Sequence, residues 1–438
     1  MPKTKAPAGA WRNWAGNQRA VAGAVVRPSS TDEVAEAVRA AAAAGTTIKP
    51  VGSSHSFTAA AATSGVRMEL PRLTGLVRVD RASAQVSVLA GTPLAVLNRE
   101  LAAHGLALPN LGDVDVQTIS GALATGTHGT GAGYGCLSTF VEELELVTGT
   151  GDVVRCSEKE RPDVFAAARV GIGAVGIVTE VTLRCVEAFI LHADERPAPL
   201  ADVLARVDEH VAANDHFEFY WMPYTERTLT KANNRAVADS APRSRFATWF
   251  NDDLLENTVI GAVCRLCRAV PPLTPTLLRT TARFFPRRGY TERSDVVFTS
   301  PRRVRFLEME YGVPRAALPD AFAGLRRVIE SLPVKVALPV EVRFTAADDI
   351  WLSHGYGRDN AYVAIHQFVG MPFAEYFRGF EAVCGPLGGR PHWGKLHYRD
   401  AASLASAYPR FGDFLAVRDR LDPARVLANG YTRQVLGT

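Results

Sequence analysis

Residues 110–130 read NLGDVDVQTISGALATGTHGT, and this stretch is too rich in glycine for a helix or a plain strand. Glycine can take positive φ or let another molecule approach the backbone closely, and hydroxyl side chains between glycines add hydrogen-bond donors. The glycines are Gly112, Gly121, Gly126 and Gly129, and the hydroxyl residues are Thr118, Ser120, Thr125 and Thr127. The combination favours a ligand with many anionic oxygens, and a glycine-rich loop without a ligand is the alternative.

A second small-residue turn, PVGSSHS at residues 50–56, follows a predicted helix over residues 31–44 and a short predicted strand over residues 46–48. The helix is indicated by the hydroxyl cap Ser30, by alanine content and by Gly45 past its end. The turn should expose successive backbone N–H groups, and concave rows of such groups bind phosphate. A third run, GIGAVGIVT at residues 171–179, precedes a predicted strand over residues 180–185.

Composition restricts the class of protein. The chain has 438 residues, 47% of them hydrophobic, and a formal net charge of +4. No block of like charges requires nucleic acid as a partner. The N-terminal residues are basic but lack a following apolar run, so we expect no signal peptide, no membrane span and a cytoplasmic location. Six dispersed cysteines then predict free thiols, and the pair Cys264 and Cys267 lacks the further ligands of a metal site.

The order of predicted elements indicates an α+β fold. Alternating residues predict strands over 67–70, 75–80 and 85–90, and residues 93–104 predict a helix. No GxGxxG opens a helix after an early strand, so the usual nicotinamide fingerprint is missing. Residues 244–285 form an apolar stripe among arginines; a buried helix pair or an oligomer contact is the favoured interpretation, and an interfacial membrane patch is the alternative.

The three glycine runs, in this order, resemble the FAD-binding half of the vanillyl-alcohol-oxidase family. Further along, the strings EMEY at residues 308–311 and HWGK at residues 392–395 resemble its sugar-1,4-lactone oxidase branch, which includes gulonolactone and arabinonolactone oxidases and the related alditol oxidases. The resemblance covers about the whole chain and is weakest over residues 240–300.

The resemblance implies a two-domain flavoprotein. Residues 1–187 would form the FAD-binding domain, residues 188–400 a substrate (cap) domain built on an antiparallel sheet, and residues 401–438 a segment that returns to the FAD domain as a strand and turn. It also implies FAD attached covalently through His55, although some relatives bind FAD without the bond. The residues assigned to FAD, with no metal ligand among them, are Gly52, Ser53, Ser54, His55, Ser56, Asp113, Thr118, Gly121, Thr125, Gly126, Thr127, His128 and Ile177.

The candidate catalytic residues lie in the second half. Glu341 and Arg343 alternate on a predicted strand, so a carboxylate and a guanidinium emerge on one face, which suits a polyol or lactone unless they form an ordinary surface salt bridge. His366, on another predicted strand, could accept a proton or be a hydrogen-bonded core group. By resemblance, His366 would face the substrate and Lys395 would lie against the flavin, where a cation stabilises arriving negative charge.

The reaction that these assignments favour is hydride transfer from the carbinol carbon of a sugar 1,4-lactone to FAD. Arg343 would polarise the hydroxyl oxygen, Glu341 would hold a neighbouring hydroxyl, and L-gulono-1,4-lactone would give ascorbate after tautomerisation. At Gly112 the resemblance implies a gap that admits oxygen, so we expect an oxidase that forms hydrogen peroxide; a turn that needs glycine for positive φ is the other interpretation. Asp113 departs from the small or hydroxyl residue expected there. The alternatives are an alditol oxidase, a dehydrogenase with another acceptor, and a flavin-free phosphate-binding protein.

Overall fold

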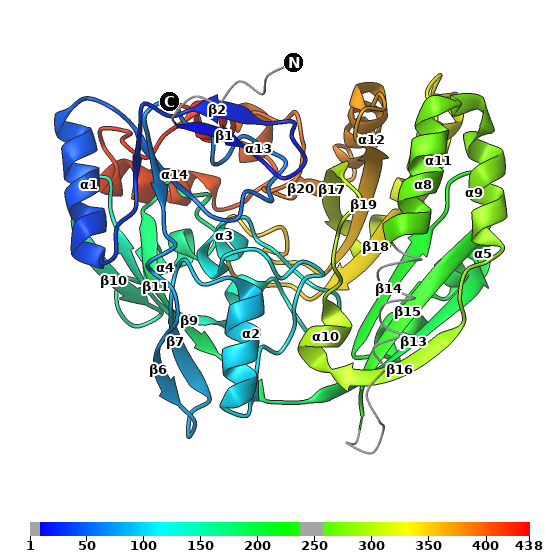
Figure 1. Cartoon of the computed structure of the whole chain (residues 1–438), viewed down its shortest axis with the longest axis horizontal. Helices are drawn as coiled ribbons and strands as arrows, with labels where there is room; N and C mark the ends of the chain where they lie inside the picture. Colours follow the sequence, from blue (N-terminus) through cyan, green and yellow to red (C-terminus); the bar gives the residue numbers. More distant parts are fainter. Residues whose placement is uncertain (1–8, 237–256) are drawn as a thin grey trace, which may run out of the picture.

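The computed structural model describes residues 9–236 and 257–438 of the chain. Two sections lie side by side: the N-terminal part together with the C-terminal helices, and a broad antiparallel sheet with its own helices (Figure 1). Strand β12 (Val186–Glu187) still pairs within the first section, with β8 (Leu106–Ala107), and β13 (Ile190–Pro199) opens the broad sheet. We therefore propose that the boundary between the two domains lies near residue 187.

The first section begins with a parallel three-stranded sheet in the order β3-β5-β4. Its strands are β3 (Ala24–Val26), β4 (Ile48–Val51) and β5 (Val66–Glu69). The predicted helix is confirmed as α1 (Thr31–Ala43), with the Ser30 hydroxyl accepting from the Glu33 amide at 3.2 Å and Gly45 at φ +61°. The strand predicted over residues 46–48 is shifted to β4, because the Thr46 amide still donates to Ala41 of the helix at 3.0 Å.

An antiparallel five-stranded sheet completes this section, in the order β10-β9-β11-β7-β6. The strands are β6 (Leu76–Asp80), β7 (Gln85–Leu89), β9 (Val141–Val147), β10 (Val153–Ser157) and β11 (Ile177–Arg184). The section also contains the helices α2 (Leu94–Ala103), α3 (Ile119–Ala124) and α4 (Pro162–Ala168). The hairpin of β1 (Ala10–Arg12) and β2 (Arg19–Val21) contacts β5, where the Arg67 guanidinium donates to the Ala10 carbonyl at 3.2 Å. The α+β prediction is confirmed.

The second section is built on an eight-stranded sheet in the order β16-β13-β15-β14-β18-β19-β17-β20, in which every pairing is antiparallel. Besides β13, its strands are β14 (His216–Trp221), β15 (Arg227–Ala236), β16 (Arg288–Arg293), β17 (Phe306–Pro314), β18 (Val340–Thr345), β19 (Asn360–Phe368) and β20 (Arg390–Pro391). Every residue of β18 and β19 is buried, so charges on these strands need partners inside the protein.

Helices flank this sheet. They are α5 (Leu200–Ala205), α6 (Val207–Ala212), α8 (Ile260–Ala269), α9 (Thr274–Ala282), α10 (Ser294–Phe298), α11 (Leu318–Ser331) and α12 (Ala374–Cys384). Helices α11 and α12 bury leucines and phenylalanines in one core with the sheet. Of the apolar stripe predicted over residues 244–285, the part before residue 257 lies outside the described residues, and the rest forms α8 and α9.

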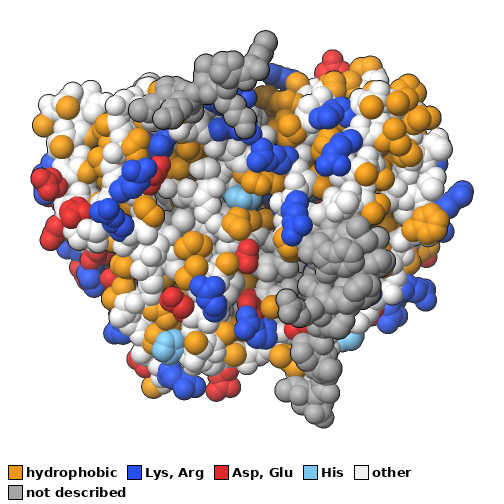
Figure 2. All heavy atoms as spheres, viewed as in Figure 1, with side chains coloured by type: hydrophobic (Ala, Val, Ile, Leu, Met, Phe, Trp, Pro, Cys, Tyr) orange, Lys and Arg blue, Asp and Glu red, His pale blue; other side chains and the backbone are white. Residues whose placement is uncertain are grey.

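Cys264 and Cys267, on α8, pack in an apolar cluster with Leu338 and Phe368. All six cysteines are free and buried, as predicted. No helix of the described chain combines the length and the apolar character needed to cross a membrane. On the face seen in Figure 2, acidic and basic side chains are interspersed along the middle, where the two sections meet.

The C-terminal segment returns to the first section as helices (red in Figure 1): α13 (Ala401–Ala405), α14 (Phe411–Leu421) and α15 (Gly430–Leu436). The return strand predicted there is wrong. The Asp422 carboxylate accepts from the amides of Val426 and Leu427 at 2.7 and 2.8 Å, which satisfies these groups without a ladder. The return itself is anchored by the buried Lys49, whose ammonium donates to the carbonyls of Gly173 and Leu427, each at 2.9 Å.

Asn429 should be a stability-determining residue of this return. Its amide nitrogen faces the carbonyls of Ala59, Ala60 and Ala62 at 2.9–3.0 Å, and its side-chain oxygen caps α15. We expect Asn429→Ala to lower the free energy of unfolding by about 2–4 kcal/mol, because the cap and buried hydrogen bonds are lost together. Urea unfolding measures this. Gln434→Ala, an exposed change in the same helix, is the control; an equal loss in both variants would contradict the anchoring role.

Candidate active site

The loop that follows β4 has a strained turn at Ser54, which adopts φ +61° although it is not glycine. The indole of Trp11 donates to the Ser54 hydroxyl at 2.8 Å, and the Trp14 amide donates to the Ser54 carbonyl at 2.8 Å. The next side chain, His55, stacks on Trp14 with ring centroids 5.1 Å apart. The N-terminal tryptophans therefore fix the direction in which His55 points.

Glycine is required where this loop meets residues 110–130. A Cβ on Gly52 would lie 2.5 Å from the Thr118 hydroxyl, and one on Gly121 would lie 2.9 Å from the same oxygen. Thr118 caps α3, because its hydroxyl accepts from the Gly121 amide at 3.3 Å. Two loops far apart in sequence thus pack closely and leave their backbones accessible.

These loops border a cavity of about 520 Å³. Its lining includes most residues predicted to bind the cofactor: Gly52, Ser53, Ser54, His55, Ser56, Thr118, Gly121, Thr125 and Ile177. The third glycine run also lines it, with Gly173 at φ +62°. Gly126 lines neither this cavity nor its neighbour; it turns the chain at φ +70°, and a Cβ there would lie 2.8 Å from the ring of His354.

A second cavity of about 180 Å³ adjoins the first, since His55, Ser56, Gln117 and Thr125 line both. It lies between the two sections. The other predicted residues in its lining are Asp113, Thr127, His128, Glu341, Arg343, His366 and Lys395. The structure therefore brings all four predicted catalytic residues to one place, next to His55.

Arg343 is the centre of a buried charge network in this cavity. Its Nε donates to Glu218 at 2.9 Å, and its guanidinium also pairs with Glu341. The Tyr220 hydroxyl donates to both carboxylates, at 3.1 Å to Glu218 and 3.2 Å to Glu341. Burial raises the pKa of Glu341; Arg343 offsets part of this effect, while Asp113 and Glu218 add to it. The surface salt bridge considered from the sequence is therefore excluded.

Glu218 and Tyr220 were not predicted as site residues. They lie opposite Arg343 and Glu341 in the register of β14 with β18. Cross-strand neighbours share a face of the sheet, so the register alone brings these four side chains together.

Lys395 is held by two carboxylates that the sequence analysis also left unassigned. Its ammonium lies 2.5 Å from Glu308 and 2.7 Å from Glu310. The string EMEY carried the signal, because Glu308 and Glu310 alternate on β17 and so share one face. Burial alone would lower the pKa of Lys395, but the two carboxylates raise it, so the ammonium keeps its charge.

His366 lies opposite Glu308 in the register of β17 with β19. Its Nδ1 faces the Pro339 carbonyl at 2.9 Å, and its Nε2 lies 3.3 Å from Glu308. Although burial would lower the pKa of His366, the Glu308 carboxylate raises it. The imidazole therefore holds a proton to higher pH than an ordinary histidine does.

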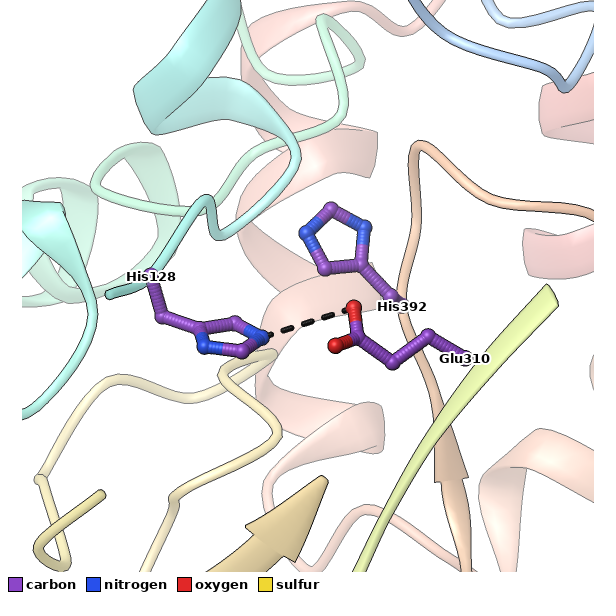
Figure 3. A group of neighbouring side chains, drawn as sticks. All are labelled: His128, Glu310 and His392. Atoms are coloured by element: carbon purple, nitrogen blue, oxygen red, sulfur yellow. Dashed lines mark ion pairs between the residues drawn. The ribbon is translucent and has the colours of Figure 1, made fainter. Parts of the chain in front are cut away.

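His128 and His392 converge on Glu310 (Figure 3). Their candidate ligand atoms lie within 4.8 Å of one another, which is close enough for a metal ion to be considered. The same Glu310 oxygen, however, lies 2.7 Å from the Lys395 ammonium and 3.5 Å from His128, so its charge is already matched. Burial holds the pKa of His392 well below its usual value, and this imidazole is therefore neutral.

Gly112 and Asp113 stand at the seam between the sections. Gly112 does not adopt positive φ, so the turn interpretation is wrong; a Cβ there would lie 3.2 Å from both the His128 carbonyl and the Thr127 methyl group. The Asp113 carboxylate reaches Arg302 at 2.5 Å and Arg343 at 3.5 Å. Arg302 was not predicted as a site residue. It pairs with Asp113, which stands where a small or hydroxyl residue was expected.

Comparison with known proteins identifies the class to which this architecture belongs. Residues 22–157 match the family described as FAD binding domain. The crystal structure of cholesterol oxidase from B. sterolicum has a TM-score of 0.85 over 98% of this chain and 96% of that chain, at 19% identity, which shows a shared fold. The protein is an α+β, two-domain flavoprotein with a vanillyl-alcohol-oxidase-type FAD-binding domain.

Within this class, the chain belongs to the D-arabinono-1,4-lactone oxidase family, which matches residues 181–435. It is 42% identical to L-gulono-1,4-lactone dehydrogenase of Mycobacterium tuberculosis over 98% of this chain and 99% of the relative. It is 33% identical to L-gulonolactone oxidase of Bos taurus and 33% identical to alditol oxidase of Streptomyces sp., each over 97% of this chain and 98% of the relative.

The residues of the larger cavity fit FAD. Gly52, Gly121 and Gly173 bring backbone without side chains to its lining, and glycine lets a phosphate approach the backbone closely. His55 lines both this cavity and the charged cavity, so a flavin ring held beside His55 would meet the substrate.

Gly52→Ala should therefore impair FAD binding. Its methyl group would meet the Thr118 hydroxyl at 2.5 Å, while the other Thr118 atoms lie at an ordinary 3.6 Å. We expect flavin content to fall about tenfold or more in Gly52→Ala and to recover partly in Gly52→Ala/Thr118→Ala, since the clashing atom is gone. Flavin absorbance per protein measures this. Gly412→Ala, at a glycine with open space, is the control; no recovery in the double variant would show that the clash is not the cause.

Proposed function

We propose that this protein catalyses the FAD-dependent oxidation of a sugar-derived 1,4-lactone of the L-gulono-1,4-lactone type. The observation that carries the proposal is the smaller cavity, where Arg343, Glu341, His366 and Lys395 line one space beside the FAD-binding domain. Fixed donors and acceptors at this density suit a ligand with several hydroxyl groups. Relatives named for gulonolactone and arabinonolactone chemistry support the same substrate class.

Bound FAD would supply the hydride acceptor. Arg343 would polarise the substrate hydroxyl oxygen through Nη1, which is less engaged than the other guanidinium nitrogens, since its Asp113 contact is 3.5 Å long. Glu341, with its raised pKa, would hold a neighbouring hydroxyl. His366 would take the hydroxyl proton once its own proton has left. Lys395 would place a lasting positive charge beside the cofactor.

The substrate class is tested by comparing sugar 1,4-lactones with xylitol and sorbitol under one assay with an artificial electron acceptor. We expect higher kcat/KM for the lactones. Arg343→Ala should lower kcat/KM about a hundredfold or more, because a buried donor to the reacting oxygen is lost. Arg326→Ala, which changes a partly exposed arginine paired with Glu226, is the control. Turnover of alditols alone would replace this proposal with an alditol oxidase.

We also propose that His55 carries the covalent bond to the flavin. Burial lowers its pKa, and Asp113 and Glu308 offset only part of this effect, so the ring nitrogen keeps a free electron pair near neutral pH. Its stacking on Trp14 fixes the ring beside both cavities.

Acid precipitation tests the bond. We expect the yellow colour to stay with the precipitated protein and to be released from His55→Ala, because that variant lacks the imidazole that would carry the bond. His192→Ala, at a histidine on β13, is the control. Colour that leaves the unmutated protein would refute the covalent link without refuting the FAD site.

The electron acceptor is proposed to be molecular oxygen, which would form hydrogen peroxide. The support is Gly112, which lines the smaller cavity without a side chain and is not there for its φ. The relatives bear both names, dehydrogenase and oxidase, so the acceptor depends on this chain's own residues.

Stopped-flow mixing of the reduced protein with air-saturated buffer measures the acceptor step. We expect rapid reoxidation in the unmutated protein and at least about tenfold slower reoxidation in Gly112→Ala, because a methyl group closes the approach of a small molecule. Gly133→Ala adds the same methyl group in open space and is the control. Reoxidation over many minutes in the unmutated protein would make it a dehydrogenase.

A further inference from the structure

Asp113 and Arg302 form the outermost charge pair of the smaller cavity. The Asp113 Oδ2 accepts from two guanidinium nitrogens of Arg302, at 2.5 and 3.2 Å. The backbones are joined as well, since the Ser300 amide donates to the Asp113 carbonyl at 3.0 Å. The Asp113 and Arg302 side chains are 26% and 30% exposed, whereas those of Arg343 and Glu341 are 6% and 7% exposed. The Asp113–Arg302 pair is therefore the more solvent-accessible of the two.

Each lysine and arginine in the lining of this cavity already has a carboxylate partner. Arg302 pairs with Asp113, Arg343 with Glu341 and Glu218, and Lys395 with Glu308 and Glu310. The cavity is rich in charge, yet it offers no lysine or arginine of the described lining as a lone anion site. Such a site suits a neutral molecule with many hydroxyl groups better than an anion.

This balance matters because a sugar 1,4-lactone has an anionic counterpart. Hydrolysis of the lactone gives an open-chain aldonate, which carries the same hydroxyl groups and a carboxylate. A guanidinium is the side chain that best binds a carboxylate, often with two parallel hydrogen bonds. Without Asp113, Arg302 would be such a binding point in the lining of the cavity.

We infer that Asp113 is a specificity residue that excludes aldonates by occupying Arg302, so that the cavity accepts the neutral lactone. The inference rests on the proposed function. Burial alone would raise the pKa of Asp113, but Arg343 and Arg302 hold it well below its usual range. The carboxylate therefore stays ionised at neutral pH and keeps Arg302 occupied.

The test titrates the FAD-loaded protein with sodium L-gulonate under anaerobic conditions at constant ionic strength and follows the visible flavin spectrum. This readout needs no turnover. We expect no saturable change with the unmutated protein and saturable binding at least about tenfold tighter with Asp113→Asn. The double variant Asp113→Asn/Arg302→Gln should return to the unmutated behaviour, because the guanidinium that captures the carboxylate is gone. Asp359→Asn removes an exposed carboxylate paired with Arg315 and controls for the change in net charge.

Asp113→Ser is a second neutral variant, and it must gain the same affinity for gulonate. It replaces Asp113→Asn in the test if that variant does not fold. Gulonate binding by both neutral variants that is no tighter than in the unmutated protein would overturn the inference, as would a gain that survives the removal of Arg302. L-Gulono-1,4-lactone is titrated in parallel. A lactone that fails to reduce the flavin would refute the proposed function, while the gulonate comparison would still decide the role of Asp113.

Discussion

A buried charge must be matched inside the protein, because removing an ion from water costs several kcal/mol unless a partner replaces the lost hydration. The inner face of the eight-stranded sheet carries Glu218, Glu308, Glu310, Glu341 and Arg343, all buried. Their partners come partly from the other section: Asp113 reaches Arg343 and Arg302, and His128 reaches Glu310. The charges of the site therefore also determine how the two sections meet.

This constraint explains why the two faces of the eight-stranded sheet differ. Helices α11 and α12 cover one face of the sheet with leucine and phenylalanine, which leaves the other face to charged residues. The glycine loops bring a backbone-lined cavity against that charged face, and the N-terminal tryptophans hold His55 between the two. The C-terminal segment is held against the first section by Lys49, which donates to the Leu427 carbonyl, and by Asn429, which donates to the Ala59 carbonyl. Chemistry and cofactor binding thus depend on parts of the chain that are far apart in sequence.

Local sequence signals predicted much of this structure. A hydroxyl cap and a terminal glycine define α1, and alternation on β18 places Glu341 and Arg343 on one face. The partners were not predictable, because Glu218 and Glu308 reach their places through the strand register, which depends on long-range pairing. Gly126 was assigned to the cofactor from its motif, although its conformation serves the turn. The return strand was predicted by resemblance, and it does not form because the Asp422 side chain takes the place of a backbone partner for the amides of Val426 and Leu427.

The central claim is that the charged cavity holds a sugar lactone against FAD for hydride transfer. Anaerobic titration of the FAD-loaded protein with L-gulono-1,4-lactone tests this most directly, because it isolates the transfer from the choice of electron acceptor. We expect the flavin absorbance to bleach fully as lactone is added. A flavin that stays oxidised with the lactones but bleaches with a chemical reductant would contradict it.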